Sequence, residues 1–307
     1  MENLNQTIVR KFILLGLSTI PHLQAFSFLL FLLMYVFTLS GNLLLITVVR
    51  INTQLQTPMY FFLTNLSFID ICFSSAIVPN ILKNTISNDK SISFVGCATQ
   101  MCFNLGLGAT ESVILAVMAF DRYAAICKPL QYNTIMDKKL CVRLTAGSWS
   151  VSFLNSVIHT AVTFLLPFCK SNNLNHFFCE MPPLLRLSCR DTTSNEIAMY
   201  ISCGLLGLSS FLLTLMSYVH IISNILKIRS NTGRHKAFST CASHLTVVSL
   251  YYVTIMVIYM RPRSTYSPNR ERVLSILYTV VAPMLNPIIY SIRNKEVKGT
   301  LRKNKQL

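Results

Sequence analysis

The sequence predicts an all-α membrane protein: a seven-transmembrane helix bundle with a short amphipathic C-terminal interfacial helix. Composition is the first observation behind this prediction, because 52% of the 307 residues are hydrophobic, 12% are charged and the mean hydropathy is +0.50. Such a chain is too apolar for an ordinary soluble domain. The second observation is a series of apolar runs of about 20 residues, the length that crosses a bilayer as a helix. Because lipid offers the backbone no hydrogen-bond partner, each run is expected to be helical.

Seven apolar runs, separated by polar connectors, define the expected helices. They cover residues 24–49, 59–82, 98–121, 142–167, 196–226, 237–260 and 273–292. The chain is therefore divided into an extracellular N-terminal segment (1–23), the transmembrane bundle (24–292) and a cytoplasmic tail (293–307). In the tail, Val297 and Leu301 lie four residues apart among basic residues, which favours a short interfacial helix. No cleavable signal peptide is expected, because the residues before the first run are polar.

The distribution of basic residues predicts the orientation in the membrane. With the N-terminus outside, the inner segments hold 16 of the 27 Lys and Arg residues and the outer segments hold 11. This bias follows the positive-inside rule and favours a multi-pass plasma-membrane protein with an extracellular N-terminus. Asn5-Gln6-Thr7 is a glycosylation acceptor triplet on that outer side. Since the basic residues are spread over short connectors, membrane lipid is the expected partner of the +16 charge, and nucleic acid is not.

Reactive motifs and cysteines narrow the class further. The sequence has no Gly-rich phosphate loop, no His-Glu-x-x-His, no nucleophile elbow and no paired Cys-x-x-Cys, so an enzyme is not expected. Six of the ten cysteines lie within or at the edges of apolar runs and are expected to be small buried side chains. The other four, Cys97, Cys169, Cys179 and Cys189, lie in or beside one polar loop and are candidates for disulfides. They permit three pairings, among which spacing does not choose.

Two carboxylates lie inside the apolar runs. Asp70 in the second run and Glu111 in the third are expected to face the interior of the bundle, because a charge in hydrocarbon is costly. Two interpretations are open. The pair holds a Na⁺ ion, with oxygens of Asn42, Asn286 and Ser112 completing the site. Alternatively, one carboxyl group is protonated and simply hydrogen-bonded. No other metal or cofactor is expected.

The third run carries a stripe of residues at helical spacing, namely Asn104, Gly108, Glu111, Leu115, Met118 and Arg122. Arg122 lies 18 residues beyond Asn104, or about 27 Å along a helix, so the stripe joins the outer half to the inner end. A plain core-facing stripe has the same spacing. Near the end of the seventh run, Asn286-Pro287 with Tyr290 indicates a hinge, since proline removes a backbone hydrogen bond and kinks the helix.

Ordered motifs along the chain carry a family resemblance. General marks are Asn42, Asp70, Asp121-Arg122-Tyr123, Trp149 and Asn286-Pro287-Ile288-Ile289-Tyr290. More specific marks are PMYFFL at 58–63, MAFDRYAAICKPLQY at 118–132, Ser217-Tyr218, KAFSTCASHL at 236–245 and PMLNPIIYSIRNKEVK at 283–298. The sequence thus resembles the rhodopsin-like G-protein-coupled receptors and, among them, the odorant receptors of vertebrates. Two residues depart from the family pattern: Phe120 replaces the usual Tyr, and Val253 replaces the usual Gly, beside Tyr252.

The resemblance implies a receptor that binds a small-molecule odorant and activates a heterotrimeric G protein of the stimulatory, olfactory type, raising cyclic AMP. The alternative is a non-olfactory rhodopsin-like receptor for another small ligand. A transporter is disfavoured, because the seven runs show no inverted repeat. The resemblance also implies the disulfides Cys97–Cys179 and Cys169–Cys189. It implies a switch in which Asp121 holds Arg122 until the inner end opens; the residues of the switch are Asp121, Arg122, Tyr123, Tyr218, Asn286, Pro287 and Tyr290.

The resemblance, together with helical spacing, implies a ligand pocket in the outer half of the bundle. Its expected residues are Asn104, Leu105, Gly108, Ser202, Cys203, Tyr252, Ile255, Tyr259, Ile276 and Thr279. None of them is charged, so a neutral ligand is expected, since an unpaired buried ion is costly. Tyr259 is expected to give the orienting hydrogen bond, followed by Asn104. The alternative is that Tyr259 packs at the membrane interface with other aromatic side chains.

Overall fold

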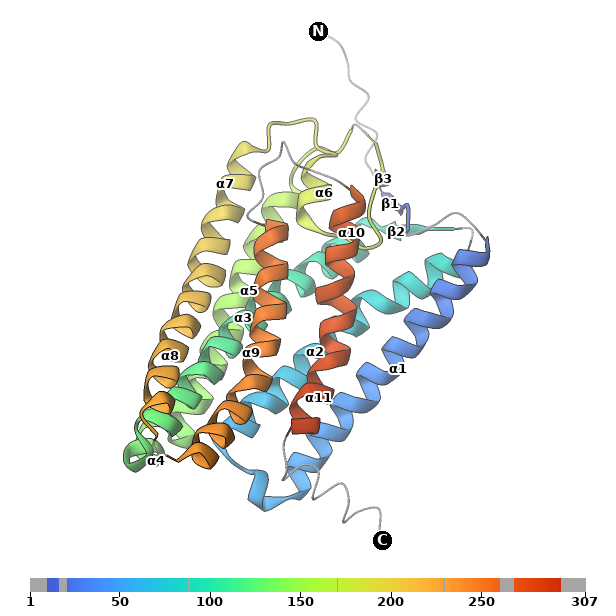
Figure 1. Ribbon diagram of the computed structural model, residues 1–307. Helices are drawn as coiled ribbons and strands as arrows, with labels where there is room; N and C mark the ends of the chain where they lie inside the picture. Colours follow the sequence, from blue (N-terminus) through green and yellow to red (C-terminus); the bar gives the residue numbers. More distant parts are fainter. Residues whose placement is uncertain are drawn as a thin grey trace.

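A computed structural model describes residues 10–16, 21–87, 89–169, 171–228, 230–259 and 268–293 as a bundle of long helices that run side by side (Figure 1). The helices are α1 (Pro21–Ile51), α2 (Pro58–Ile86), α3 (Phe94–Cys127), α5 (Lys138–Phe164), α7 (Thr193–Ser202), α8 (Ser209–Leu226), α9 (Asn231–Tyr259), α10 (Pro268–Ile276) and α11 (Ala282–Arg293). A π-helical turn, η3 (Cys203–Leu208), joins α7 to α8, and another, η5 (Leu277–Val281), joins α10 to α11. The described part of the chain therefore forms seven continuous helical segments, which confirms the predicted fold class.

Hydropathy alone separates one helix from the rest. Within the described ranges, six of the helical segments are long and apolar enough to cross a membrane. The exception, α5, has the length but carries buried polar side chains at helical spacing: Ser148, Ser152, Ser156, His159 and Thr163. These side chains face the bundle rather than lipid, so they lower the hydropathy of α5 without preventing it from packing as a span.

Several helices extend beyond their apolar runs. Helix α3 begins at Phe94, where the hydroxyl of Ser93 accepts a 3.0 Å hydrogen bond from the amide of Gly96. Helix α5 begins at Lys138, where the Asp137 carboxylate caps the amide of Leu140 at 2.7 Å. Caps of this kind satisfy the first backbone amides outside the hydrocarbon, where an apolar run has already ended. Helix α5 ends at Phe164, before the expected residue 167, because the position preceding Pro167 disfavours the helical conformation.

A small sheet closes one end of the bundle, which the sequence did not predict. Strand β1 (Lys11–Leu14) lies between β2 (Ser91–Ser93), antiparallel to it, and β3 (Asn173–Leu174), parallel to it. The fully buried Phe12 of β1 packs edge-on against Phe168 with 5.3 Å between ring centroids. Both disulfides lie at this end, which is therefore the outer end. The N-terminal segment is thus a structural part of the outer surface.

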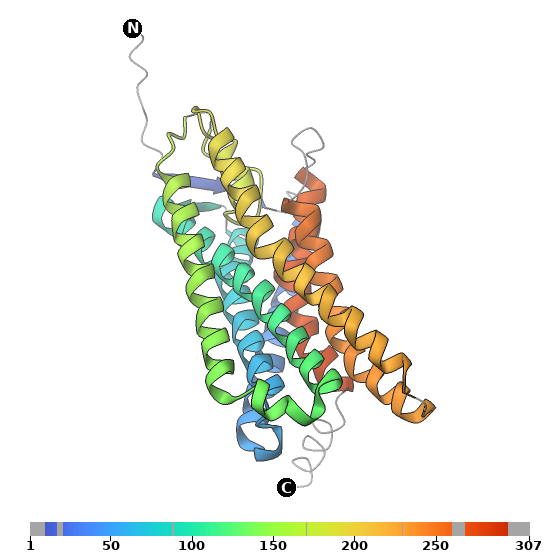
Figure 2. The same ribbon diagram turned by 90° about the vertical axis from the view of Figure 1, so that its left-hand side faces the viewer.

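The interior is arranged around α3, which packs against α2, α5 and α8. Gly106 of α3 permits a close approach to α5, since a Cβ atom there would lie 3.1 Å from the ring of Phe153. Towards the inner end, a separate apolar cluster joins Tyr218 and Ile221 of α8 to Cys241 of α9. The connector after α3 holds the short helices η2 (Pro129–Gln131) and α4 (Tyr132–Ile135), and η1 (Thr53–Leu55) joins α1 to α2 (Figure 2). The expected interfacial helix at 293–307 lies outside the described residues.

Candidate ligand cavity and inner switch region

The outer half of the bundle holds a partly open cavity of about 100 Å³ between α3, α5, α7, η3, α9 and η5. It is lined by Asn104, Leu105, Gly108, Ala109, Ser112, Asn155, His159, Met181, Met199, Ser202, Cys203, Leu206, Gly207, Tyr251, Ile255 and Tyr278. A cavity of about 150 Å³ holds a molecule of the size of benzene, so this space suits a small ligand.

The lining contains no Asp, Glu, Lys or Arg side chain. Most of its polar atoms are already engaged within the protein. Nε2 of His159 lies 2.7 Å from the Ser202 hydroxyl, which bridges α5 and α7. The hydroxyl of Tyr251 donates to the carbonyl oxygen of Gly108. The cavity is therefore largely apolar, with few polar groups left for a ligand.

Asn104 differs from the other polar lining residues named above, because its polar atoms are not engaged within the protein. Its side chain is only 8% exposed, it lines the cavity, and neither Nδ2 nor Oδ1 has a hydrogen-bond partner. A buried amide without partners loses the hydrogen bonds that it would make to water, at a cost of about 1–3 kcal/mol for each unsatisfied group. The Asn104 amide is therefore a buried donor and acceptor without partners, on a residue that lines the cavity.

Six of the ten expected pocket residues line this cavity: Asn104, Leu105, Gly108, Ser202, Cys203 and Ile255. Tyr252 does not, and this expectation requires correction. Its hydroxyl donates to the carbonyl oxygen of Ser112 at 2.8 Å, and its ring packs against Phe211 at 5.4 Å. The neighbouring Tyr251 lines the cavity instead, because successive residues on a helix point about 100° apart.

The expectation for the seventh helix also requires correction. Thr279 is fully buried and donates to the carbonyl oxygen of Ser275 in its own helix, and Ile276 packs against the main apolar cluster. Tyr278 lines the cavity in their place. The π-helical turn η5 begins at Leu277 and changes the phase of the helix, which regular 3.6-residue spacing does not anticipate. The side chain of Tyr259 lies outside the described part of the structure.

The cavity residues that sequence reasoning missed come mainly from α5 and from the outer loop. Asn155 and His159 lie four residues apart on α5, and Met181 begins the short helix α6 (Met181–Leu185). Two polar side chains at this spacing inside an apolar run were a usable signal, because polar residues in a membrane helix face the bundle. Met181 gave no such signal, since its position depends on the fold of the loop.

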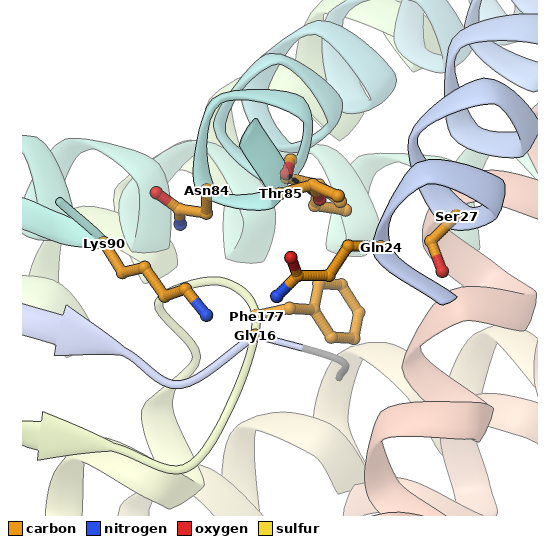
Figure 3. A pocket seen from close by; sticks show the side chains of 8 residues that line it. Gly16, Gln24, Ser27, Asn84, Thr85, Lys90 and Phe177 are labelled. Carbon is orange, nitrogen blue, oxygen red and sulfur yellow. Dashed lines mark hydrogen bonds between the residues drawn. The ribbon is translucent and has the colours of Figure 1, made fainter. Parts of the chain in front are cut away.

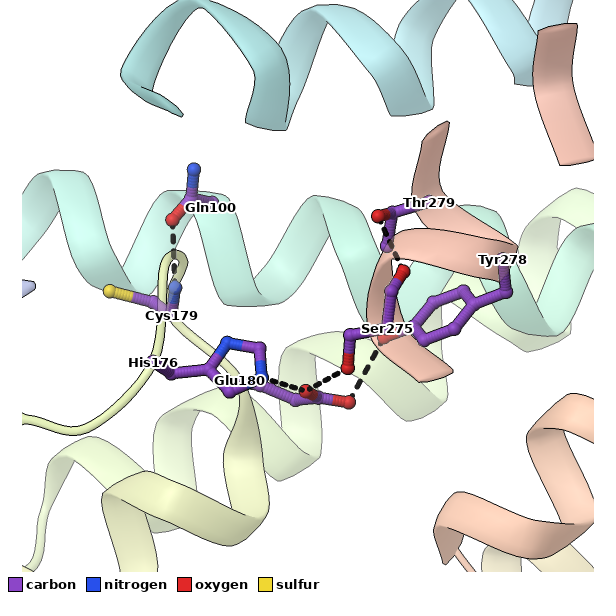
Figure 4. A network of polar contacts seen from close by, with 7 residues as sticks. All are labelled: Gln100, His176, Cys179, Glu180, Ser275, Tyr278 and Thr279. Atoms are coloured by element: carbon purple, nitrogen blue, oxygen red, sulfur yellow. Dashed lines mark hydrogen bonds and ion pairs between the residues drawn. The ribbon is translucent and has the colours of Figure 1, made fainter. Parts of the chain in front are cut away.

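Above the cavity, a buried carboxylate ties the outer loop to the seventh helix (Figure 4). Oε1 of Glu180 accepts a 3.0 Å hydrogen bond from the Tyr278 hydroxyl, and Oε2 accepts a 3.4 Å hydrogen bond from Ser275. Nε2 of His176 lies 3.6 Å from the same carboxylate. Burial, reinforced by the positive charge of Arg272, lowers the pKa of His176 to about 3. The ring is therefore neutral, and its contact with Glu180 is not an ion pair.

The same loop is attached to α3. Cys179 forms a disulfide with Cys97, with 5.4 Å between their Cα atoms, and the amide of Cys179 donates to Oε1 of Gln100 at 2.9 Å. Cys169 and Cys189 form the second disulfide, which closes a loop of the same connector. Both pairings are those that the family resemblance implied. Residues 176–180 are thus fixed on two sides above the ligand cavity.

A second hollow at the outer end is too small for an organic ligand. It has a volume of about 20 Å³, and its lining includes Gln24, Asn84, Lys90 and Phe177 (Figure 3). A space of this size holds about one water molecule. Asn5, the expected glycosylation site, lies outside the described residues.

Asp70 lies at the centre of a buried polar cluster. Nδ2 of Asn286 donates to both of its carboxylate oxygens, at 3.1 and 3.0 Å, and Asp70 interacts electrostatically with Glu111. Three buried oxygens, Oδ1 of Asn42, Oδ1 of Asn286 and Oγ of Ser74, have no hydrogen-bond partner. Ser112, which was expected in this cluster, instead lines the ligand cavity. Oxygen atoms of carboxylates, amides and hydroxyls are the ligands that a hard cation prefers.

At the inner end, Asp121 interacts electrostatically with the neighbouring Arg122, but its hydrogen bond goes to another residue. Oδ1 of Asp121 accepts a 2.8 Å hydrogen bond from the hydroxyl of Tyr132, which the connector after α3 brings alongside. Among the described residues, no ion pair joins Asp121 to Arg122, and Nε of Arg122 has no hydrogen-bond partner. Sequence spacing did not indicate Tyr132, because its position depends on the turn between Cys127 and Tyr132.

The other expected switch residues surround the same inner region. The hydroxyl of Tyr218 lies 2.7 Å from Nδ1 of His244, joining α8 to α9, and the buried hydroxyl of Tyr290 has no partner. Tyr123 packs against His220, with 5.8 Å between ring centroids. Pro287 lies within α11 against Gly41, where a Cβ atom would approach its ring to 3.1 Å.

The two departures from the family pattern lie at the surface of the bundle. Val253 is 62% exposed and Phe120 is 38% exposed. Val253 therefore points away from the bundle and adds no bulk against the buried Tyr252.

A bundle of seven helical segments, with a cavity in its outer half and a buried polar cluster around Asp70, is the architecture of a seven-transmembrane receptor. A family model described as "Olfactory receptor" matches residues 31–305. Olfactory receptor 5I1 from Homo sapiens is 50% identical over 97% of this chain and 95% of its own length. Olfactory receptor 5AR1 from Mus musculus is 48% identical over 99% of this chain and 98% of its own length. The chain belongs to the olfactory receptor family, and it is a multi-pass plasma-membrane receptor rather than an enzyme.

Proposed function

We propose that this receptor binds a small, neutral, volatile odorant in the cavity between α3, α5 and η3. The observation that carries the proposal is the unpartnered amide of Asn104 in a lining without ionic side chains. A charged ligand would be buried without a counter-charge, which costs several kcal/mol. A neutral molecule with one oxygen function, such as an alcohol, aldehyde, ketone or ester, would satisfy the amide.

The size of the cavity limits the affinity. Its volume of about 100 Å³ admits few heavy atoms, and the binding free energy of a small ligand is bounded by its atom count. Burial of apolar surface supplies most of the binding, at about 25 cal/mol per Å², while Asn104 sets the orientation. We therefore expect micromolar or weaker binding.

We further propose that the odorant activates a stimulatory, olfactory-type G protein and so raises cyclic AMP. The free Nε of Arg122 and the unpartnered hydroxyl of Tyr290 support this role, since both are available to form new contacts when the inner end opens. The ligand would act by its higher affinity for the open bundle, which shifts the population of the two states.

We also propose a Na⁺ ion between Asp70 and Glu111. The unpartnered oxygens of Asn42, Asn286 and Ser74 support this proposal, because Na⁺ is held by oxygen ligands. The ion would neutralise the two carboxylates and favour the closed state of the bundle, to which it binds more tightly.

A cyclic AMP reporter assay on a chemically broad odorant panel tests the proposed ligand. The best agonist is then measured on Asn104→Leu, which removes the amide at similar volume and should weaken an oxygenated agonist about tenfold or more. Asn84→Leu is the matched control, because Asn84 is equally buried but lines the small outer hollow. A receptor that answers best to amines or carboxylic acids, or an unchanged Asn104→Leu response, contradicts the proposal.

A further inference from the structure

A cavity much larger than the ligand cavity lies at the inner end of the bundle. It measures about 720 Å³ and lies between α1, the α1–α2 connector, α2 and the start of α5. We call this cavity the inner groove. Its floor is apolar and buried, formed by Leu55, Met136 and Cys141. Phe68 and Val142, which are exposed, form its wall towards the bilayer. Cavities of about 300–1,000 Å³ accommodate organic ligands, so the inner groove is large enough for part of a lipid.

The polar lining of the inner groove is positive. It includes the cations Arg50, at the end of α1, and Lys138, at the start of α5, and it includes no Asp or Glu. Among the described residues, neither cation makes a hydrogen bond or an ion pair with a side chain. The groove also contains the N-terminus of α2, where Thr57 provides no side-chain cap and Pro58 occupies the first turn. That helix end adds a partial positive charge. The nearby Asp137 is engaged as the cap of α5.

The position of the inner groove defines what can fill it. It lies at the end opposite the disulfides, which is the cytoplasmic side, and its exposed wall faces the acyl chains of the inner leaflet. The basic tail of the chain is a poor occupant, because Lys295, Lys298 and Arg302 would repel the two cations. The cytoplasmic leaflet is rich in anionic phospholipids, whose headgroups attract basic residues at the interface.

We propose that the inner groove binds an anionic phospholipid of the cytoplasmic leaflet. Its headgroup lies at the rim with Arg50 and Lys138, and an acyl chain lies along Phe68 and Val142. A zwitterionic phospholipid carries its own positive charge on the headgroup, which makes it the weaker ligand.

Binding of lipid in the inner groove can be measured by the fluorescence of a tryptophan that the chain already contains. Trp149 is its only tryptophan, and its ring lies 6.0 Å from that of Phe68 in the wall of the groove. The purified full chain is reconstituted in phosphatidylcholine vesicles that contain a minor share of either phosphatidylserine or phosphatidylcholine with brominated acyl chains. Bromine quenches tryptophan fluorescence on contact, so brominated phosphatidylserine should quench Trp149 at a lower mole fraction than brominated phosphatidylcholine.

Substitutions of the two cations test whether the preference for phosphatidylserine arises in the inner groove. Arg50→Gln and Lys138→Gln should each lower the preference for phosphatidylserine about fivefold, the change expected from about 1 kcal/mol per basic residue near an anionic headgroup. Lys139→Gln is the matched control, because Lys139 is an exposed neighbour on α5 that does not line the groove. Arg50→Lys, which retains the charge, should keep the preference. If Arg50→Gln does not fold, Lys138→Gln at an exposed first turn carries the test.

Three results would overturn the proposal. One is equal quenching of the wild type by the two brominated lipids. Another is an equal loss of preference in Lys139→Gln, which would mean a diffuse attraction to the whole basic face. The third is equal relief of quenching from both lipids on adding cholesterol, which would mean that an uncharged sterol occupies the groove.

Discussion

The hydroxyl of Tyr278 donates a 3.0 Å hydrogen bond to Oε1 of Glu180, and the same tyrosine lines the ligand cavity. One side chain of the seventh helix therefore contacts both the outer loop and the space for the ligand. A ligand that moves this ring must also alter the attachment of the loop. The seventh helix and the loop should consequently respond together when the cavity is filled.

Tyr278→Phe tests this connection. The substitution keeps the ring and removes a hydrogen bond to a charged acceptor, a type of contact that contributes about 1.5–3 kcal/mol. We expect agonist potency in a cyclic AMP assay to fall severalfold at unchanged surface expression. Tyr35→Phe is the matched control, because its hydroxyl also forms a 3.0 Å bond, to Ser75, but far from the cavity. Equal potency of the two variants would contradict the connection.

The neutral state of His176 predicts a dependence of stability on pH. Burial lowers the pKa of this ring to about 3, whereas in an unfolded chain it is about 6.5. Its contribution to stability is therefore complete above about pH 6.5 and is lost as the pH falls towards 3, since only the unfolded chain takes up the proton. The melting temperature of the purified receptor should fall as the pH is lowered from about 7.5 to about 5.5, about one unit on either side of the unfolded pKa.

His176→Phe should flatten this pH profile, because it removes the titrating group that Glu180 and Arg272 surround. His235→Gln changes an exposed histidine and should leave the profile unaltered. A wild-type slope that persists in His176→Phe would assign the pH dependence to another group.

The proposed role of Arg122 predicts a separation of signalling from folding. Arg122→Ala should abolish the cyclic AMP response while surface expression, measured by antibody labelling of intact cells, remains near the wild-type level. Only a partly buried side chain without an ion pair is removed, so little folding energy is lost. Arg143→Ala, at an exposed site on α5, should signal normally. An intact response of Arg122→Ala at equal surface level would exclude the switch.

The proposed Na⁺ site predicts sensitivity to the cation. Replacing external sodium by choline at constant ionic strength should raise basal or agonist-driven cyclic AMP in the wild type, because the closed bundle loses its ligand. Asp70→Asn should respond equally in both media, since the amide keeps the size of the side chain but not the charge. A wild-type receptor indifferent to sodium would refute the site.

Hydropathy was sufficient to predict the bundle, but not where its helices end. A chain that crosses lipid needs long apolar helices, and the apolar runs that form them can be seen in the sequence itself. The caps at Ser93 and Asp137 lie outside the hydrocarbon, so the apolar pattern does not report them. The sheet of β1, β2 and β3 was missed because its strands have at most four residues and pair across long separations in sequence.

The ligand cavity was predicted best where regular helical spacing applies. Asn104, Leu105 and Gly108 lie on the regular helix α3 and line the cavity as expected. Spacing could not decide between Tyr251 and Tyr252. The two residues are neighbours on α9, and the sequence pattern does not say which of them the rotation of the helix turns towards the cavity. Spacing also could not anticipate the phase change in η5 or the position of Met181, which follow from tertiary packing.

The sheet at the outer end limits how the receptor can be shortened or labelled. Strand β1 pairs with β2 and β3, the Arg10 carbonyl accepts from the amide of Phe94, and Phe12 is fully enclosed. An epitope tag or export sequence joined at the N-terminus must therefore leave β1 in place. A deletion that removes Lys11–Leu14 would instead take away the middle strand and leave the edges of β2 and β3 without a partner.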